Sequence, residues 1–150
     1  MNTIPVTNAR QLITGFKIRA ARAWPIEFLA FPLGRKHEDG SIEVVAFYYP
    51  KDWREHAAEK QVELPGKWWL EALEVAAAGK MMPLGTLHSH CYRRGETVFD
   101  EVQSLGDLDS WDIIDRIAGI CNVIELASGK KQCGDPVFHG PPNNCEVTIK

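Results

Sequence analysis

Two histidines stand two positions apart at the end of an apolar segment, His88 and His90 in the stretch TLHSH. Alternate side chains of a β-strand point to the same face of its sheet, so both imidazoles can be directed toward one point. Imidazole nitrogen is a common ligand of Zn²⁺, and a catalytic zinc site usually combines three protein ligands with a bound water. The pair therefore predicts two ligands of a zinc site, and two surface histidines on one strand are the alternative.

A third ligand is expected from the downstream segment that contains Ser104-x-x-Asp107. Asp107 falls in the first turn of an expected helix, where the positive end of the helix dipole stabilises a carboxylate. The same pair also fits a helix cap, with Ser104 at the N-cap and an acidic residue three positions later. Asp100 of Thr97-x-x-Asp100 is a second possible ligand, but we prefer Asp107 because the helical periodicity begins beside it.

One carboxylate stands at the start of an otherwise apolar segment, where Glu27 is the only charged residue of WPIEFLAFPLG. Burying a carboxylate is costly unless it has a partner or a chemical role. Next to a zinc-bound water, whose pKa falls to about 7 in favourable sites, it can act as a general base. The alternative is a solvated carboxylate at the rim of a sheet.

The elements that must position these residues follow from the periodicity of apolar side chains. Helical spacing is found over residues 8–23, 67–80 and 104–118. Strands are expected over 26–34, 42–49, 84–90, 121–127 and 145–149, with turns at Asp39-Gly40 and Ser128-Gly129. Residues 51–66 and 91–103 are expected to be irregular. This order predicts an α/β fold, a sheet with helices packed on it.

Composition narrows the class of protein. A length of 150 residues suits one domain, and a formal charge of −3 disfavours a nucleic-acid-binding protein. No apolar segment approaches the roughly 20 residues that span a bilayer, and we expect no membrane contact. Without the pattern of a signal peptide, a cytoplasmic protein with reduced thiols is expected. A structural zinc site formed by Cys133, His139 and Cys145 is conceivable, but scattered loop residues explain that spacing better.

Taken together, these residues resemble the JAMM, or MPN+, family of zinc metallopeptidases (Mov34 and prokaryotic JAB type). The signature of that family is a glutamate on an early strand, followed by H-[ST]-H-x7-S-x-x-D. Glu27 matches the glutamate, His88 and His90 the histidines, and Ser104 and Asp107 the last two positions. The resemblance extends from about residue 5 to residue 127. It implies one JAMM/MPN-type domain over residues 1–150, with a mixed central β-sheet of cytidine-deaminase-like architecture.

The chain departs from the signature in three places. Cys91 stands where a proline commonly follows the second histidine, and Ala30 stands where a glycine is expected. Thirteen residues rather than about seven separate His90 from Ser104, a lengthening that costs little conformational entropy. The insertion keeps Asp100 as the alternative ligand. Its residues Arg93 and Arg94 could contact acidic groups of a substrate, or the segment could be a solvated loop. Cys91 is expected to be a passive loop residue.

By this resemblance His88, His90 and Asp107 would bind Zn²⁺, Glu27 would be the general base, and Ser104 would stabilise the oxyanion. The implied activity is hydrolysis of an amide bond, by an isopeptidase or peptidase acting after the C-terminal tail of a ubiquitin-like or sulfur-carrier protein. The alternative is a catalytically silent MPN-type scaffold or protein-binding module. A zinc deaminase of nucleobases fits less well, because H-S-H replaces H-x-E and the sequence has no C-x-x-C.

Overall fold

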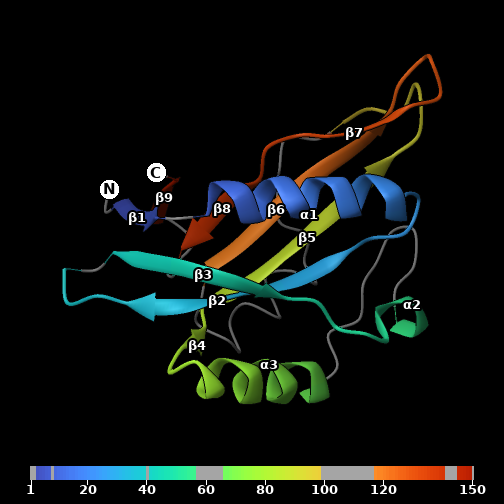
Figure 1. Cartoon of the computed structure of the whole chain (residues 1–150). Coiled ribbons are helices and arrows are strands. Elements are labelled where there is room, and N and C mark those ends of the chain that lie inside the picture. The colour runs from blue at the N-terminus through green and yellow to red at the C-terminus, as the bar shows by residue number, and fades with distance from the viewer. Residues whose placement is uncertain are drawn as a thin grey trace.

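The computed structural model describes residues 3–7, 9–39, 41–56, 66–98, 117–140 and 145–149 (Figure 1). In chain order its elements are β1 (Thr3–Thr7), α1 (Arg10–Ala23), β2 (Leu29–Lys36), β3 (Ile42–Tyr48), α2 (Trp53–His56), α3 (Gly66–Ala78), β4 (Met82–Pro83), β5 (Gly85–Tyr92), β6 (Ile117–Glu125), β7 (Lys131–Cys133), β8 (Val137–Gly140) and β9 (Cys145–Ile149). Among the helices that the structure describes, none combines the length and the apolar character needed to cross a membrane.

The nine described strands form one mixed sheet. Strands β5 and β6 are parallel and pair over eight positions, from Gly85 opposite Ile117 to Tyr92 opposite Ile124. Strand β2 flanks β5 in the antiparallel direction, and beyond β6 the order continues through β8, β9 and β1 to β3. Because β3 also pairs with β2, the sheet curls until its strands form a closed circuit. The expected α/β class with a mixed sheet is confirmed.

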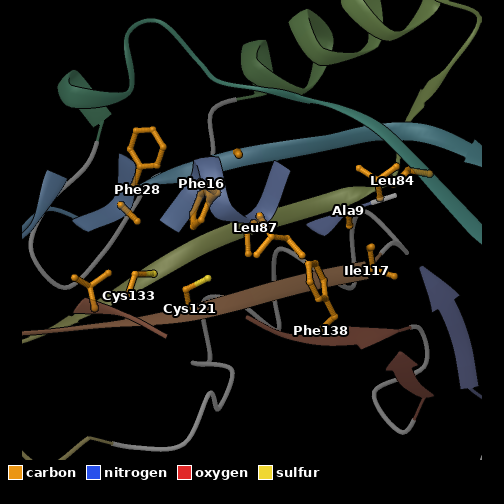
Figure 2. Close-up of a cluster of buried hydrophobic side chains, with 14 of the residues drawn as sticks. Ala9, Phe16, Phe28, Leu84, Leu87, Ile117, Cys121, Cys133 and Phe138 are labelled. Carbon is orange, nitrogen blue, oxygen red and sulfur yellow. The ribbon is translucent and has the colours of Figure 1, made fainter. Parts of the chain in front are cut away.

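Helix α1 packs on one face of the sheet because one side of the helix is apolar. Its buried residues recur with helical spacing, at Ile13, Phe16, Ala20 and Ala23. The ring of Phe16 lies 5.6 Å from the ring of Phe28 on the sheet, measured between centroids. The same cluster reaches Leu87 on β5 and Cys121 on β6 (Figure 2). We call this layer the α1-side core.

Helix α3 covers the opposite face of β2 and β4 (Figure 1). Its buried residues Trp68, Ala72 and Ala76 pack against Leu29, Phe31 and Leu33 of β2. Phe28 and Ala30, which alternate with them along the chain, belong to the α1-side core. Strand β2 is therefore buried on both faces, and this explains why its sequence is almost continuously apolar rather than alternating.

Most of the expected elements are confirmed, and most of the differences arise from pairing between distant segments. The helix expected over 104–118 is wrong at its end, because Ile117 and Ala118 already pair with β5 as the first residues of β6. Its other residues lie outside the described ones. Residues 53–56 form the short helix α2 within a segment expected to be irregular. Strands β1, β4, β7 and β8 were not expected from the sequence.

Gly85 allows β5 to begin in direct contact with β6. A Cβ at this position would lie 1.7 Å from the carbonyl oxygen of Ile117, and the φ of Gly85 is 157°. We predict that Gly85→Ala lowers the free energy of unfolding by about 2–3 kcal/mol, because the backbone of one strand must move to make room. Urea denaturation of the two proteins measures the difference.

Gly15 provides a matched control in the middle of α1, where a Cβ would meet no heavy atom within 4 Å. Gly15→Ala should raise the free energy of unfolding by about 0.5–1 kcal/mol, because alanine loses less backbone entropy in a helix than glycine does. Stability of Gly85→Ala equal to that of the unsubstituted protein would contradict the role given to the contact between β5 and β6.

Candidate functional site

Four polar or charged side chains are buried in the part of the chain that the structure describes, and they come from neighbouring strands. They are Glu27, His88, Ser89 and Asn122, with exposed fractions of 6%, 5%, 0% and 5%. His88 and Ser89 belong to β5, Asn122 belongs to the adjacent β6, and Glu27 lies two residues before β2. Burial of polar groups is costly unless they are paired. Their concentration at the junction of β2, β5 and β6 therefore marks the candidate site.

The imidazoles of His88 and His90 face each other. Their Nε2 atoms are 3.0 Å apart, and the ring centroids are 4.9 Å apart with an angle of 59° between the rings. At this distance one nitrogen donates a hydrogen bond and the other accepts it, so at least one imidazole is neutral. Two nitrogens bound to one tetrahedral Zn²⁺ would be about 3.3 Å apart. The spacing of the pair is thus close to that of two ligands of a single ion.

The register of β5 and β6 places a carboxamide beside the histidines. His90 is paired with Asn122 and His88 with Ile120 across the two parallel strands. Paired residues project to the same face of a sheet, so the side chain of Asn122 shares the face of both imidazoles. Asn122 is the site residue that the sequence analysis missed. The available signal was one amide within the apolar stretch ICNVI, but its relation to His90 depends on pairing between distant strands.

The antiparallel register of β2 and β5 brings Glu27 to the level of the histidines. Leu29 is opposite His88. One residue earlier, the amide N–H of Phe28 donates to Oγ of Ser89 at 2.8 Å, and the amide N–H of Ser89 donates to the carbonyl oxygen of Phe28 at 3.0 Å. The same register continued by one residue sets Glu27 opposite His90. Since Phe28 packs into the α1-side core, strand alternation directs Glu27 toward the face of the histidines.

Cys91 is not the loop residue that was expected. It belongs to β5, it is 7% exposed, and its Sγ donates a hydrogen bond to the carbonyl oxygen of Ile26 at 3.6 Å. Its side chain lies in the α1-side core. Because His88 and His90 alternate with it along the strand, they project to the other face, and the Cys91 thiol is separated from them by the sheet.

Of the residues of the conceivable structural zinc site, Cys133 is part of the α1-side core. Cys133 lies beside Cys121 in this core (Figure 2). The thiol of Cys121 donates a hydrogen bond to Cys133, which together with burial raises the pKa of Cys121, and the same bond lowers the pKa of Cys133. His139 and Cys145 belong to β8 and β9, and their side chains are not among those described.

The two arginines of the inserted segment are engaged by the chain itself. The guanidinium of Arg94 donates to the carbonyl oxygen of Ala127 at 3.1 Å, and its amide N–H donates to Oε1 of Glu125 at 3.2 Å. That bond and the ammonium of Lys131 lower the pKa of Glu125. The guanidinium of Arg93 lies 5.3 Å from the centre of the Trp24 ring. These contacts favour a structural role for the start of the insertion over that of a substrate-binding flap.

The remaining predicted site residues, Ser104 and Asp107, and the alternative Asp100 lie outside the described residues. The third zinc ligand and the oxyanion group therefore stay predictions. Among the residues whose placement is described, no group of three His, Cys, Asp or Glu side chains is arranged to hold a metal ion. The described part of the site thus consists of two imidazoles, a carboxylate at their level and a carboxamide beside them.

Comparison with known proteins establishes the fold. No protein-family model matches the sequence, and no curated protein matches it. The solution structure of a protein from Desulfitobacterium hafniense is similar with a TM-score of 0.59 and 16% identity, over 98% of this chain and 93% of that chain. The solution structure of a protein from Salinibacter ruber is similar with a TM-score of 0.54 and 18% identity, over 96% of this chain and 85% of that one.

Ser89 connects β5 to the backbone that carries Glu27, and its contribution can be measured. We predict that Ser89→Ala lowers the free energy of unfolding by about 1–3 kcal/mol, because the buried N–H of Phe28 would lose its acceptor. Ser128→Ala is the control, since Ser128 is exposed and its Oγ accepts from the N–H of Lys130 only at 3.4 Å. Chemical denaturation should show a change below about 0.5 kcal/mol for that variant. Equal effects of both substitutions would remove Ser89 from this role.

Proposed function

We propose that the chain is a zinc-dependent isopeptidase or peptidase of the JAMM (MPN+) type. Its substrate would be an amide bond after the C-terminal tail of a ubiquitin-like or sulfur-carrier protein. The observation that carries the proposal is the 3.0 Å separation between Nε2 of His88, which is buried, and Nε2 of His90, which is half-buried. A mixed sheet with helices on both faces is also compatible with the JAMM/MPN architecture.

The donor set fits Zn²⁺. Neutral imidazole is a preferred zinc ligand, and the pair of histidines requires that at least one ring is neutral. In this proposal His88, His90 and Asp107 hold the ion. Asn122 lies opposite His90 on the neighbouring strand, where a polar side chain can help to orient a ligand imidazole. Bound zinc would supply a Lewis acid that polarises the substrate carbonyl and makes a water more acidic.

Two side chains of this protein would move or stabilise charge during hydrolysis. Glu27 accepts a proton from the attacking water through its carboxylate, and it then returns that proton to the nitrogen of the leaving amine. Ser104 donates a hydrogen bond to the oxygen on which negative charge develops. Ser89 is a positioning residue, because its Oγ fixes the amide of Phe28, the residue that follows Glu27.

A catalytically silent MPN-type module that binds protein partners is the second candidate. The observation that favours it is the same distance of 3.0 Å, because this is also the length of a direct hydrogen bond between two imidazoles. Such a bond satisfies the Nε2 atom of each ring without a metal. The two candidates therefore differ in whether the chain binds zinc.

Metal content separates these candidates. We predict about one zinc ion per chain by elemental analysis after purification, and its loss in both His88→Ala and His90→Ala, since the site would lose a ligand. His37→Ala is the control, because the side chain of His37 is exposed and lies near Glu43 on the β2–β3 hairpin. A chain that takes up no zinc when it is supplied would rule out the hydrolase and leave the binding module.

Substitution of the proposed base separates catalysis from metal binding. We predict that Glu27→Gln retains zinc but hydrolyses ubiquitin-like fusion proteins about 10³-fold more slowly, because the amide cannot accept the proton. Glu74→Gln removes an exposed carboxylate from α3 and should leave the rate unchanged. Turnover by Glu27→Gln at the original rate would exclude Glu27 as the base.

The third ligand can be assigned by comparing two conservative substitutions. We predict that Asp107→Asn weakens zinc binding, because a neutral amide is a poorer ligand than a carboxylate, and that Asp100→Asn leaves it unchanged. Competition with a chromogenic chelator measures both affinities. The reverse outcome would assign the third ligand to Asp100, within the inserted segment.

A further inference from the structure

An open cleft lies at the C-terminal end of α1, next to the short helix α2. Its volume is about 410 Å³, and its walls come from α1, from Phe28 just before β2 and from residues 49–54. Its described lining residues do not include Glu27, His88 or His90. Its size falls within the range of about 300–1,000 Å³ that is typical of ligand-binding clefts.

The rim of the cleft is cationic. Arg19, Arg22, Lys51 and Arg54 line it and are exposed, and none of the described lining residues is acidic, although the chain as a whole carries a charge of −3. The nearby carboxylate of Asp52 is engaged elsewhere, by the ammonium of Lys67 and by Nε1 of Trp68. Four like charges around one hollow produce a positive potential that attracts anions.

The floor of the cleft is aromatic. The ring of Phe28 lies 4.8 Å from that of Trp53 and 5.6 Å from that of Tyr49, between centroids. Two guanidinium groups are stacked on this floor: Arg19 lies 4.6 Å from the centre of the Tyr49 ring, and Arg54 lies 4.7 Å from that of Trp53. Stacking restricts the plane of a guanidinium and leaves its N–H edge oriented for an oxyanion.

These features define the chemistry of the ligand. It needs negative groups for the stacked arginines and an apolar group for the aromatic floor between them. A nucleotide base would have to displace Arg19 or Arg54 in order to stack, since both guanidinium groups already cover the rings of Tyr49 and Trp53. An extended peptide can pair its carboxylates with the outer N–H edges of both guanidinium groups, and its smaller apolar side chain needs only the part of the floor between them. An open cleft also admits a chain that continues beyond it.

We propose that this cleft binds a short acidic segment of a partner protein. Carboxylates of the segment pair with Arg19 and Arg54, and an apolar side chain packs on the aromatic floor between the two guanidinium groups. The assignment does not depend on the hydrolase proposal. If the chain is a hydrolase, a segment bound here lies against Phe28, the residue next to Glu27, and holds its protein close to the active site.

Binding can be measured by fluorescence anisotropy with the full chain and a fluorescein-labelled peptide of sequence EEFEE. We predict that the double variant Arg19→Gln/Arg54→Gln raises the Kd about tenfold, since two partly exposed ion pairs are lost. The control is Arg10→Gln/Lys36→Gln, which removes two exposed charges from the opposite end of α1 and from the end of β2. It should leave the Kd within about twofold. Equal losses in both double variants, or none in either, would overturn the proposal.

Three further arms test the ligand and its independence from zinc. A peptide EEGEE of equal charge should bind more weakly than EEFEE, and equal affinity would exclude a role for the aromatic floor. Pyrophosphate should compete less well than EEFEE, and tighter binding of pyrophosphate would replace the acidic segment with a phosphate ligand. His88→Ala should bind EEFEE with unchanged affinity even if it loses zinc, so failure of the hydrolase proposal would not affect this result.

Discussion

Polar groups buried within a sheet must be satisfied by one another or by a ligand, and this requirement governs the junction of β2, β5 and β6. The strands meet it through their register. The amide of Phe28 donates to Ser89 Oγ and the two imidazoles face each other, while the backbone register sets Asn122 opposite His90. A slip of one residue would exchange the faces of β5 and bring both histidines into the α1-side core. The site therefore exists only in one register.

The two faces of the sheet divide the chemistry of the chain. The α1 face of β5, β6 and β7 carries the three described cysteines, Cys91, Cys121 and Cys133, all buried among apolar side chains. The opposite face carries the imidazoles and the carboxamide of Asn122. Thiolates bind zinc strongly, and the described donors on the side of the proposed site are the nitrogen and oxygen atoms of His88, His90 and Asn122. Such a set suits a catalytic zinc ion with an open position better than a closed structural site.

The sequence predicts what local periodicity determines and misses what distant pairing determines. Helices α1 and α3 each bury one apolar stripe, so their spacing is visible in the chain. Ile117 continues the apolar spacing of the segment before it, yet it pairs with Gly85, and the sheet overrides the helical pattern. The convergence of His88 and His90 follows from their separation by two residues. The position of Asn122 opposite His90, and of Glu27 opposite His90 on the other neighbouring strand, cannot be read from the sequence, because both depend on the register between strands.

The two residues that precede β2 contribute to both the proposed zinc site and the cationic cleft. Glu27 and Phe28 are adjacent, but the ring of Phe28 forms the floor of the cationic cleft while Glu27 is directed to the other face. Two hydrogen bonds between Phe28 and Ser89 hold this backbone at a fixed position on β5. Coupling between two sites requires a structural element that can adopt two conformations. The segment at Phe28, held to Ser89 by two hydrogen bonds, provides only one. A segment in the cleft would therefore act on the site by proximity, through the position it gives the partner protein, rather than by moving Glu27.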